Sequence, residues 1–374
     1  MVHFWKWLGL STLCAAVIYG ALIGLSAFQI PWRSAHFDTA AATTTQPGWV
    51  NEARYFVLNK QAFAASGDRI VVMGASNARD PFRPEIMEHR LSGWQVANAS
   101  LSGAGIDEIA DAVDLYYQQR EQTGARTVFV ISLNYLQFLE SPYSADHENP
   151  LATEAMRSGL YERREGRLTA RLPQPAEEVV VMTARPQAVV ASLPRRLFRA
   201  VFVNPDLPQV KEAVDRFRSD DPLSRWTEFI GEQRDLDTVT VPADIQQALM
   251  AQRLAGAGGD KPLGQDGFRT LADMIALIRS NGDAIVIVDL PLPEWHFAGV
   301  PVTDASYRAS LARVLDGRRN DKGVGFLSLR DFNDNDNFFD SAHTKPRLWP
   351  VLSERLAERL AAMPALAGHT PEGG

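Results

Sequence analysis

Two short motifs hold the side chains that could do chemistry. Ser76 follows an apolar run in Val71-Val-Met-Gly-Ala-Ser76-Asn, and Asp340-Ser-Ala-His343 places a carboxylate three positions before an imidazole near the end of the chain. A serine hydroxyl is a poor nucleophile unless a base accepts its proton, and a histidine oriented by a carboxylate is such a base. These three residues are the minimum set for nucleophilic acyl chemistry, provided that they meet in space.

Each motif also has a more ordinary interpretation. A Gly-x-Ser after a strand is more often a turn, and Asp-x-x-His commonly caps a helix or binds a backbone group. Ala78 replaces the second glycine of the Gly-x-Ser-x-Gly elbow, which argues against an α/β-hydrolase. The other histidines are scattered without ligand spacing, so we expect no metal, and we expect no cofactor.

A fold must position these residues, and the sequence predicts an α/β fold. Short β-branched runs alternate with longer amphipathic stretches, which implies a parallel sheet covered by helices on both faces. Ligands bind at the carboxyl ends of such strands, which is where Ser76 and Asn134 fall. The predicted strands are residues 69–73, 95–99, 127–132, 284–289 and 323–329, and the predicted helices are 106–119, 267–280, 305–315 and 350–363.

The N-terminal segment predicts a membrane anchor. Leu8 to Ile30 contains no charged residue, and a helix of that length can cross a hydrocarbon core of roughly 30 Å. A cleaved signal peptide is the competing interpretation, but its apolar core usually has only about 7 to 15 residues. We therefore expect residues 1–32 to be an uncleaved transmembrane anchor that contacts the lipid bilayer through residues 8–30. Lys6 precedes the apolar run and Arg33 follows it, so the positive charges do not fix the orientation of the anchor.

The rest of the chain divides into a linker and one domain. Residues 33–49 are rich in Ala, Thr and Gln and predict a linker, and residues 50–374 predict the globular domain. A mostly helical insertion is expected at about 149–261. Its segment 156–218 has twelve Lys and Arg against seven Asp and Glu, which fits a surface facing anionic lipid or polymer, or simply a solvated helical face. The net charge of -7 argues against a nucleic-acid partner.

Four blocks, taken in order, resemble those of the SGNH (GDSL-like) hydrolase family. The nucleophile block resembles residues 71–77, with Ala75 where the family usually has Asp. The second is similar to Val96-Ala-Asn98-Ala-Ser-Leu-Ser-Gly103. The third resembles Ile131-Ser-Leu-Asn134-Tyr, which keeps the Asn and loses a Gly and an Asp, and the last is Asp340-Ser-Ala-His343. The resemblance covers most of residues 67–145 and 283–363.

The resemblance implies a three-layer, flavodoxin-like α/β domain in which a histidine activates a serine and backbone and side-chain amides stabilise an oxyanion. We also expect polar and aromatic side chains near this sheet edge to contact the substrate. The implied catalytic residues are Ser76, Asp340 and His343, the implied oxyanion donors are Ser76, Gly103 and Asn134, and the candidates for substrate contact are Asn77, Arg79, Tyr135 and Trp295.

The departures from the strict blocks, together with the anchor, resemble the branch that modifies cell-envelope polymers, such as polysaccharide O-acetyltransferases and D-alanyl transfer proteins. That branch implies a membrane-anchored serine esterase or O-acyltransferase acting on acyl groups of an envelope or exported polysaccharide. The expected location is the bacterial inner membrane, single-pass, with the soluble domain periplasmic or extracellular. A glycan substrate and a membrane-bound acyl-donor protein are the expected partners. The alternative is a non-catalytic polysaccharide-binding or assembly component with a degenerate SGNH fold.

Overall fold

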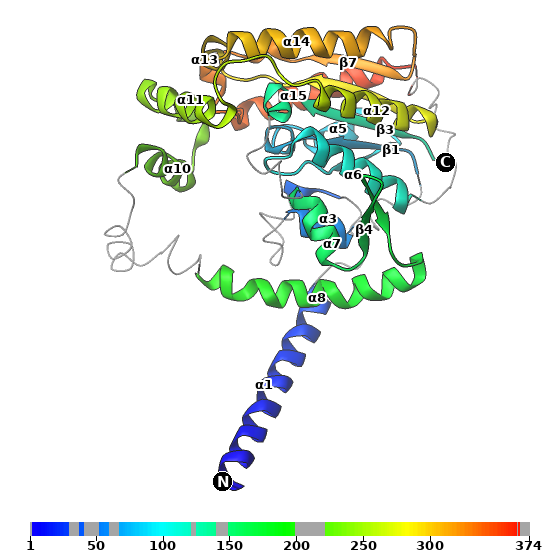
Figure 1. Ribbon diagram of the computed structural model, residues 1–374, viewed down its shortest axis with the longest axis vertical. Helices are drawn as coiled ribbons and strands as arrows, with labels where there is room; N and C mark the ends of the chain where they lie inside the picture. Colours follow the sequence, from blue (N-terminus) through cyan, green and yellow to red (C-terminus); the bar gives the residue numbers. More distant parts are fainter. Residues whose placement is uncertain are drawn as a thin grey trace.

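A long N-terminal helix projects from an α/β globular part in the computed structural model of the protein (Figure 1). The structure describes residues 2–29, 37–40, 52–59, 67–120, 125–139, 149–198, 221–364 and 366. Within these residues the sheet, its covering helices and the edge that carries the candidate site are all defined.

Five parallel strands form the central sheet, in the order β2-β1-β3-β6-β7. The order follows from register: Val71 of the first strand pairs with Ala97 on one side and Phe129 on the other. All five predicted strands are therefore confirmed. Their bounds are β1 (Arg69–Met73), β2 (Gln95–Asn98), β3 (Thr127–Leu133), β6 (Ala284–Asp289) and β7 (Val324–Ser328).

Both faces of the sheet are covered, because alternate residues of each strand point to opposite faces. Val71 and Phe129 pack on one face, and Val72 and Val130 pack on the other. The helices predicted from sequence are confirmed, with ends that differ by a few residues. On the first face lie α6 (Ile106–Gln119), α12 (Asp266–Ser280) and α14 (Pro301–Asp316), and on the second lie α5 (Pro84–Arg90) and α15 (Trp349–Ala361).

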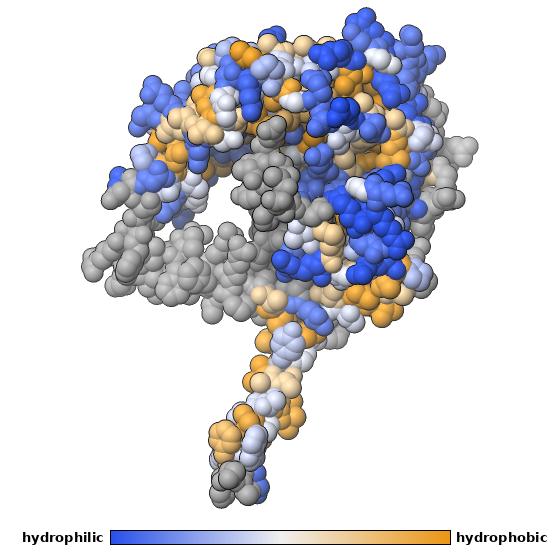
Figure 2. Space-filling view, in the orientation of Figure 1, coloured by the Kyte–Doolittle hydropathy of each residue, from blue (hydrophilic) through white to orange (hydrophobic). Residues whose placement is uncertain are grey.

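Helix α1 (Val2–Gln29) is long and apolar enough to cross a membrane. Its span Phe4–Leu25 has 22 residues, a mean hydropathy of 2.0 and no buried residues. Figure 2 shows strongly hydrophilic residues gathered on the globular part, whereas α1 carries mainly apolar and weakly polar ones. The chain thus has an N-terminal helix that is long and apolar enough to span a membrane, as the sequence predicts. Ile30, at the end of the predicted apolar run, lies outside the described residues.

Part of the predicted linker packs on the sheet. Residues 37–40 are described, and Phe37 is 2% exposed. Asp38 forms a parallel bridge with Asn98 of β2, and the Asn98 N–H donates to the Phe37 carbonyl at 2.8 Å. The Thr39 hydroxyl donates to the Ser100 carbonyl at 2.6 Å. This segment therefore extends the sheet edge beyond β2, while the rest of residues 33–49 lies outside the described residues.

Where the structure describes the insertion, in residues 149–198 and 221–261, it is mostly helical and also contains a β-hairpin. Helix α3 (Glu52–Asn59) packs against its first helix, and Arg54 pairs with Glu154 through two hydrogen bonds of 3.0 and 3.2 Å. One of its helices, α8, lies across the end of α1 (Figure 1). The insertion elements are α7 (Pro150–Arg157), β4 (Tyr161–Arg164), β5 (Arg167–Ala170), α8 (Gln174–Phe198), α10 (Pro222–Glu232) and α11 (Ala243–Ala257).

Short elements complete the described chain at the ends of strands and between helices. Part of the basic segment noted in the sequence, residues 199–218, lies outside the described residues. The short elements are α4 (Ser76–Arg79), α13 (Glu294–Gly299) and the 3-10 helices η2 (Tyr135–Phe138), η4 (Leu236–Thr238), η5 (Arg330–Phe332), η6 (Asn335–Asn337) and η7 (Pro346–Leu348).

We predict that Gly74→Ala destabilises the protein. A Cβ at Gly74 would lie 2.8 Å from both the Ser132 carbonyl oxygen and the Ala78 Cβ, so β3 or α4 must shift to admit it. Overpacking of this kind costs about 1–3 kcal/mol, which thermal unfolding followed by circular dichroism would detect. The control is Gly317→Ala, where the nearest atom lies at 3.6 Å and we expect a change within about 0.5 kcal/mol. Equal melting temperatures for the two variants would contradict the close approach.

Candidate active site

Ser76 lies at the turn between β1 and the short helix α4. The strand ends at Met73, and Gly74 lets the chain pass close to β3 before it turns. Ser76 is half-buried and is the first residue of α4, where backbone amides have no acceptor within the helix. The turn thus presents a hydroxyl and a backbone donor at the carboxyl end of β1.

The Asp340–His343 loop is folded by the Asp340 carboxylate itself. Its Oδ1 accepts the backbone N–H groups of Ala342 at 2.8 Å and His343 at 2.7 Å. Its Oδ2 lies 2.6 Å from His343 Nδ1. An antiparallel bridge between Phe338 and Thr344 closes the base of the loop. The three-residue spacing therefore has a physical cause, because one carboxylate can fold the loop and orient the ring.

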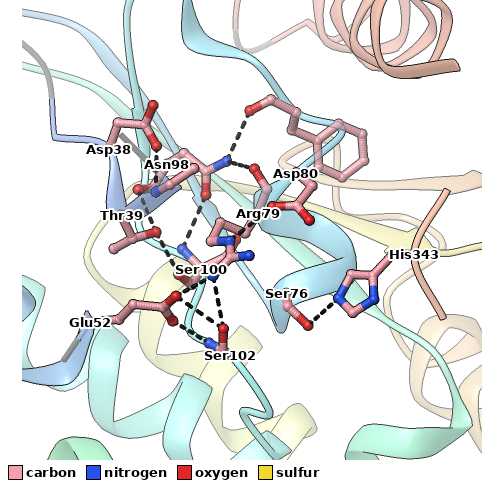
Figure 3. A network of polar contacts seen from close by, with 12 residues as sticks. Asp38, Thr39, Glu52, Ser76, Arg79, Asp80, Asn98, Ser100, Ser102 and His343 are labelled. Atoms are coloured by element: carbon pink, nitrogen blue, oxygen red, sulfur yellow. Dashed lines mark hydrogen bonds and ion pairs between the residues drawn. The ribbon is translucent and has the colours of Figure 1, made fainter. Parts of the chain in front are cut away.

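The structure brings this loop to Ser76, which is 267 positions away in the sequence. His343 Nε2 lies 2.7 Å from Ser76 Oγ (Figure 3). Since Nδ1–H donates to Asp340, the Nε2 lone pair can accept the serine proton. The His343 and Asp340 side chains are 23% and 24% exposed, so the pair is sheltered but reachable. The three residues have the geometry of a nucleophile, a base and an orienting carboxylate.

Burial and neighbouring charges act in opposite directions on the pKa values of His343 and Asp340. Burial lowers the pKa of His343, but the Asp340 charge and its hydrogen bond outweigh burial, so this pKa is raised above its ordinary value. Burial raises the pKa of Asp340, but attraction to His343 and the hydrogen bonds to the carboxylate outweigh it, so this pKa is lowered. Asp340 therefore stays ionised and stabilises the imidazolium that forms when His343 takes a proton.

Asn134 supplies a free donor at the end of the neighbouring strand β3. It is 1% exposed, and its Oδ1 accepts the Leu136 N–H at 2.9 Å, which caps η2. Among the described residues its Nδ2 finds no hydrogen-bond partner. An unsatisfied buried amide costs about 1–3 kcal/mol, so this N–H group is available to a partner that enters the site. An oxyanion is such a partner.

Gly103 lies in the loop after β2, on the other side of β1. Its φ of +73° is in the left-handed region, where glycine is tolerated without a Cβ penalty. The Ala104 N–H donates to the Leu101 carbonyl at 3.2 Å and closes a turn around Gly103. The register of β1 with its two neighbours puts this loop, Ser76 and Asn134 at one edge of the sheet. Their role as oxyanion donors stays a prediction.

Arg79 and Asn77 lie on α4, which begins at Ser76. The Arg79 guanidinium donates to Asp80 Oδ1 at 2.9 Å and to Ser102 Oγ at 2.9 Å, and it pairs with Glu52. Asn77 is 6% exposed, and its Oδ1 has no hydrogen-bond partner among the described residues. Arg79 is thus held by protein groups, and substrate contact by either residue stays a prediction.

Tyr135 and Trp295 meet at a buried histidine. The Tyr135 hydroxyl lies 2.6 Å from His296 Nδ1, and the Trp295 and His296 ring centroids are 4.3 Å apart. Burial, with the nearby positive charge of Arg253, lowers the pKa of His296 to about 3, so this imidazole is neutral. Tyr135 is 1% exposed and Trp295 is half-buried. The contacts among Tyr135, Trp295 and His296 therefore connect η2 to α13. Substrate contact by these two aromatic residues also remains untested.

The sequence did not predict the contacts of two polar residues at this edge, Asn98 and Arg253. The Asn98 amide donates to the Arg79 and Phe82 carbonyls, both at 2.9 Å, and so ties the end of β2 to the nucleophile turn (Figure 3). Arg253 of α11 donates to Ser341 Oγ at 3.1 Å, which brings the insertion against the Asp340–His343 loop. The only sequence signal for Asn98 is its place in the second block, and Arg253 has none.

Models of protein families give no match to this sequence, and curated proteins give none either. The functional conclusion therefore rests on the side chains and their geometry. An activated serine, a histidine base held by a carboxylate, and a free amide at the edge of a parallel sheet can together support attack on an acyl carbonyl.

We predict that Asp340→Asn lowers the pKa of His343. The carboxylate charge and its hydrogen bond are what raise this pKa against burial, and an amide supplies no negative charge. NMR titration of protein labelled at the histidine Cε1 carbons would measure it, with Ser76→Ala, which changes no charge, as the control. A His343 pKa that is the same in Asp340→Asn and in the unaltered protein would contradict the assigned contact.

Proposed function

We propose that this chain is a membrane-anchored serine esterase or O-acyltransferase of the SGNH type. The observation that carries the proposal is the continuous contact from Ser76 Oγ to His343 Nε2, at 2.7 Å, and from His343 Nδ1 to Asp340 Oδ2, at 2.6 Å. The unpartnered amide of Asn134 supports it, because acyl transfer needs a donor for the oxyanion.

The proposed reaction has two balanced steps. Ser76 Oγ attacks the ester carbonyl while His343 Nε2 takes the hydroxyl proton, and the oxyanion is held by amide donors. His343 then gives that proton to the departing alkoxide, which leaves an acyl group on Ser76. In the second step His343 accepts a proton from water or from an acceptor hydroxyl, whose oxygen attacks the acyl-serine and releases the product. The proton finally returns to Ser76.

The sheet supports the SGNH assignment. Its order β2-β1-β3-β6-β7 corresponds to the 2-1-3-4-5 order of flavodoxin-like folds, whose ligands bind beyond the carboxyl ends of the strands. Ser76, Gly103, Asn134 and the Asp340–His343 loop all follow strands, in the block order of the family. This is support by analogy of fold, and the chemistry of the site supplies the rest.

The substrate class follows from the anchor and the resemblance together. Helix α1 is long and apolar enough to span a membrane, which would hold the site near polymers at the cell surface. We therefore propose acyl groups of an envelope or exported polysaccharide as the substrate, with the globular domain on the outer side of a bacterial inner membrane. A membrane-bound acyl-donor protein would be the partner of a transferase.

We predict that a fluorophosphonate probe labels the full-length protein at Ser76, because the probe traps a serine that has a positioned base. Ser76→Ala should abolish labelling, and His343→Ala should reduce it by at least about 10²-fold. Peptide mapping after labelling in detergent would identify the modified residue, with heat-denatured protein as the control. Folded protein that stays unlabelled would overturn the enzymatic proposal in favour of a non-catalytic role.

Hydrolysis and transfer differ only in the acceptor of the second step. Release of free acetate from p-nitrophenyl acetate measures hydrolysis, and acetylation of an added oligosaccharide measures transfer. An acceptor that becomes acetylated at the expense of free acetate identifies a transferase, whereas acetate release without acetylated acceptor identifies an esterase.

We predict that Asn134→Asp lowers kcat for p-nitrophenyl acetate by about 10²- to 10³-fold, since loss of one oxyanion donor costs about 2.7–4 kcal/mol. The aspartate keeps an oxygen that can cap η2 through the Leu136 N–H, so the local fold should survive. Gln137→Glu is the control, because Gln137 accepts from the Asn134 backbone and not from its side-chain amide. A kcat within twofold of the unaltered protein in Asn134→Asp would exclude this donor.

A further inference from the structure

Glu52, Ser102 and Arg79 form a closed ring of polar contacts beside the candidate site (Figure 3). Glu52 Oε2 accepts the Ser102 backbone N–H at 2.6 Å, and Oε1 accepts the Ser102 hydroxyl at 3.0 Å. Arg79 Nη1 donates to Ser102 Oγ at 2.9 Å and also pairs with Glu52 Oε1. One carboxylate of α3 therefore holds two separate segments of the sheet edge.

The proposed reaction requires a fixed distance between these two segments. Arg79 is the last residue of α4, which begins at Ser76. Ser102 directly precedes Gly103, whose backbone amide is a predicted oxyanion donor. A shift of either segment changes the distance between the nucleophile and the donor, and a misplacement of about 1 Å can reduce a rate by roughly 10²-fold.

We propose that Glu52 is a positioning residue that fixes the Ser102–Gly103 loop relative to the nucleophile turn. The inference rests on the proposed acyl chemistry of Ser76. Among the described residues, the hydrogen bonds of Glu52 go to Ser102 and Arg79, and none joins it to Ser76, His343 or Asp340. It acts on the site through Ser102 and Arg79.

Contacts other than the Glu52 carboxylate also hold α3 in place. Six of its eight residues are buried, from Ala53 to Asn59 with the exception of the half-buried Arg54. Arg54 separately ties α3 to α7 through Glu154. Loss of the Glu52 charge should therefore leave the helix packed while it releases Ser102, so its effect on catalysis can be separated from an effect on folding.

The charges around His343 make the pH profile an independent check. Asp340 and Asp80 raise the pKa of His343, and Arg79 lowers it. Arg79 contacts Asp80 independently of Glu52, so we expect these three charges to stay in place when Glu52 is neutralised. A purely positioning effect should lower kcat across the whole pH range and leave the pH of half-maximal activity unchanged.

The test uses Glu52→Gln in the full-length protein. We expect kcat for p-nitrophenyl acetate to fall about 10- to 10²-fold with KM within twofold, and Glu52→Ala to lose at least as much. Hydrogen–deuterium exchange should be faster in the peptide spanning residues 99–105. The matched control is Glu154→Gln, which loosens the α3–α7 ion pair without touching Ser102 or Arg79, and which should keep both kcat and exchange within twofold.

Unchanged kcat in Glu52→Gln, or an equal loss in Glu154→Gln, would overturn the positioning role. Failure of the proposed function appears differently, because the unaltered protein would then show no hydrolysis and no fluorophosphonate labelling. In that case the exchange measurement alone decides whether Glu52 holds the loop: faster exchange confined to Glu52→Gln supports it, and unchanged exchange refutes it.

Discussion

The parallel register of β1 between β2 and β3 is the constraint on which the site depends. Parallel strands end at the same edge, so the three loops that follow them emerge side by side. The absence of a Cβ at Gly74 allows the close approach to Ser132 that this register requires. A shift of one residue would move buried side chains to the opposite face and separate the loops that carry Ser76, Gly103 and Asn134.

Groups from outside the sheet core complete the site. Thr39 and Asn98 connect residues 37–40 to the end of β2. Glu52 connects α3 to the loop that contains Ser102 and to Arg79 of α4. Arg253 connects the insertion to the Asp340–His343 loop. Residues 37–40, helix α3 and the insertion are therefore joined to the sheet edge by polar contacts around Ser76. The four sequence blocks lie at the ends of strands, so they include Ser76, Asn134 and the Asp340–His343 loop but not the residues of α3 and the insertion that surround them.

The sequence was sufficient to predict the strands, the main helices and the meeting of Ser76 with His343. The strands and helices depend on local pattern, whereas the meeting of Ser76 with His343 was expected from the resemblance of four ordered blocks to the SGNH family, together with the rule that parallel strands share an edge. The sequence was insufficient to predict the contacts of Glu52 and Arg253. A single charged residue on a helix carries no pattern that shows whether its side chain contacts another protein group or solvent. The packing of residues 37–40 was missed for a similar reason: the Ala- and Thr-rich composition predicts a spacer, while the contacts with Asn98 come from the tertiary structure.

The pairing of residues 37–40 with β2 also limits how far the domain can travel. Only residues 30–36 separate the end of α1 from this segment, and a fully extended chain of that length reaches at most about 28 Å. With α1 in a bilayer, the sheet edge stays on a short tether close to the lipid surface. For the polymer substrate that we propose, encounter then becomes a two-dimensional search, in which the rate depends on the density of polymer chains at the membrane surface rather than on their bulk concentration.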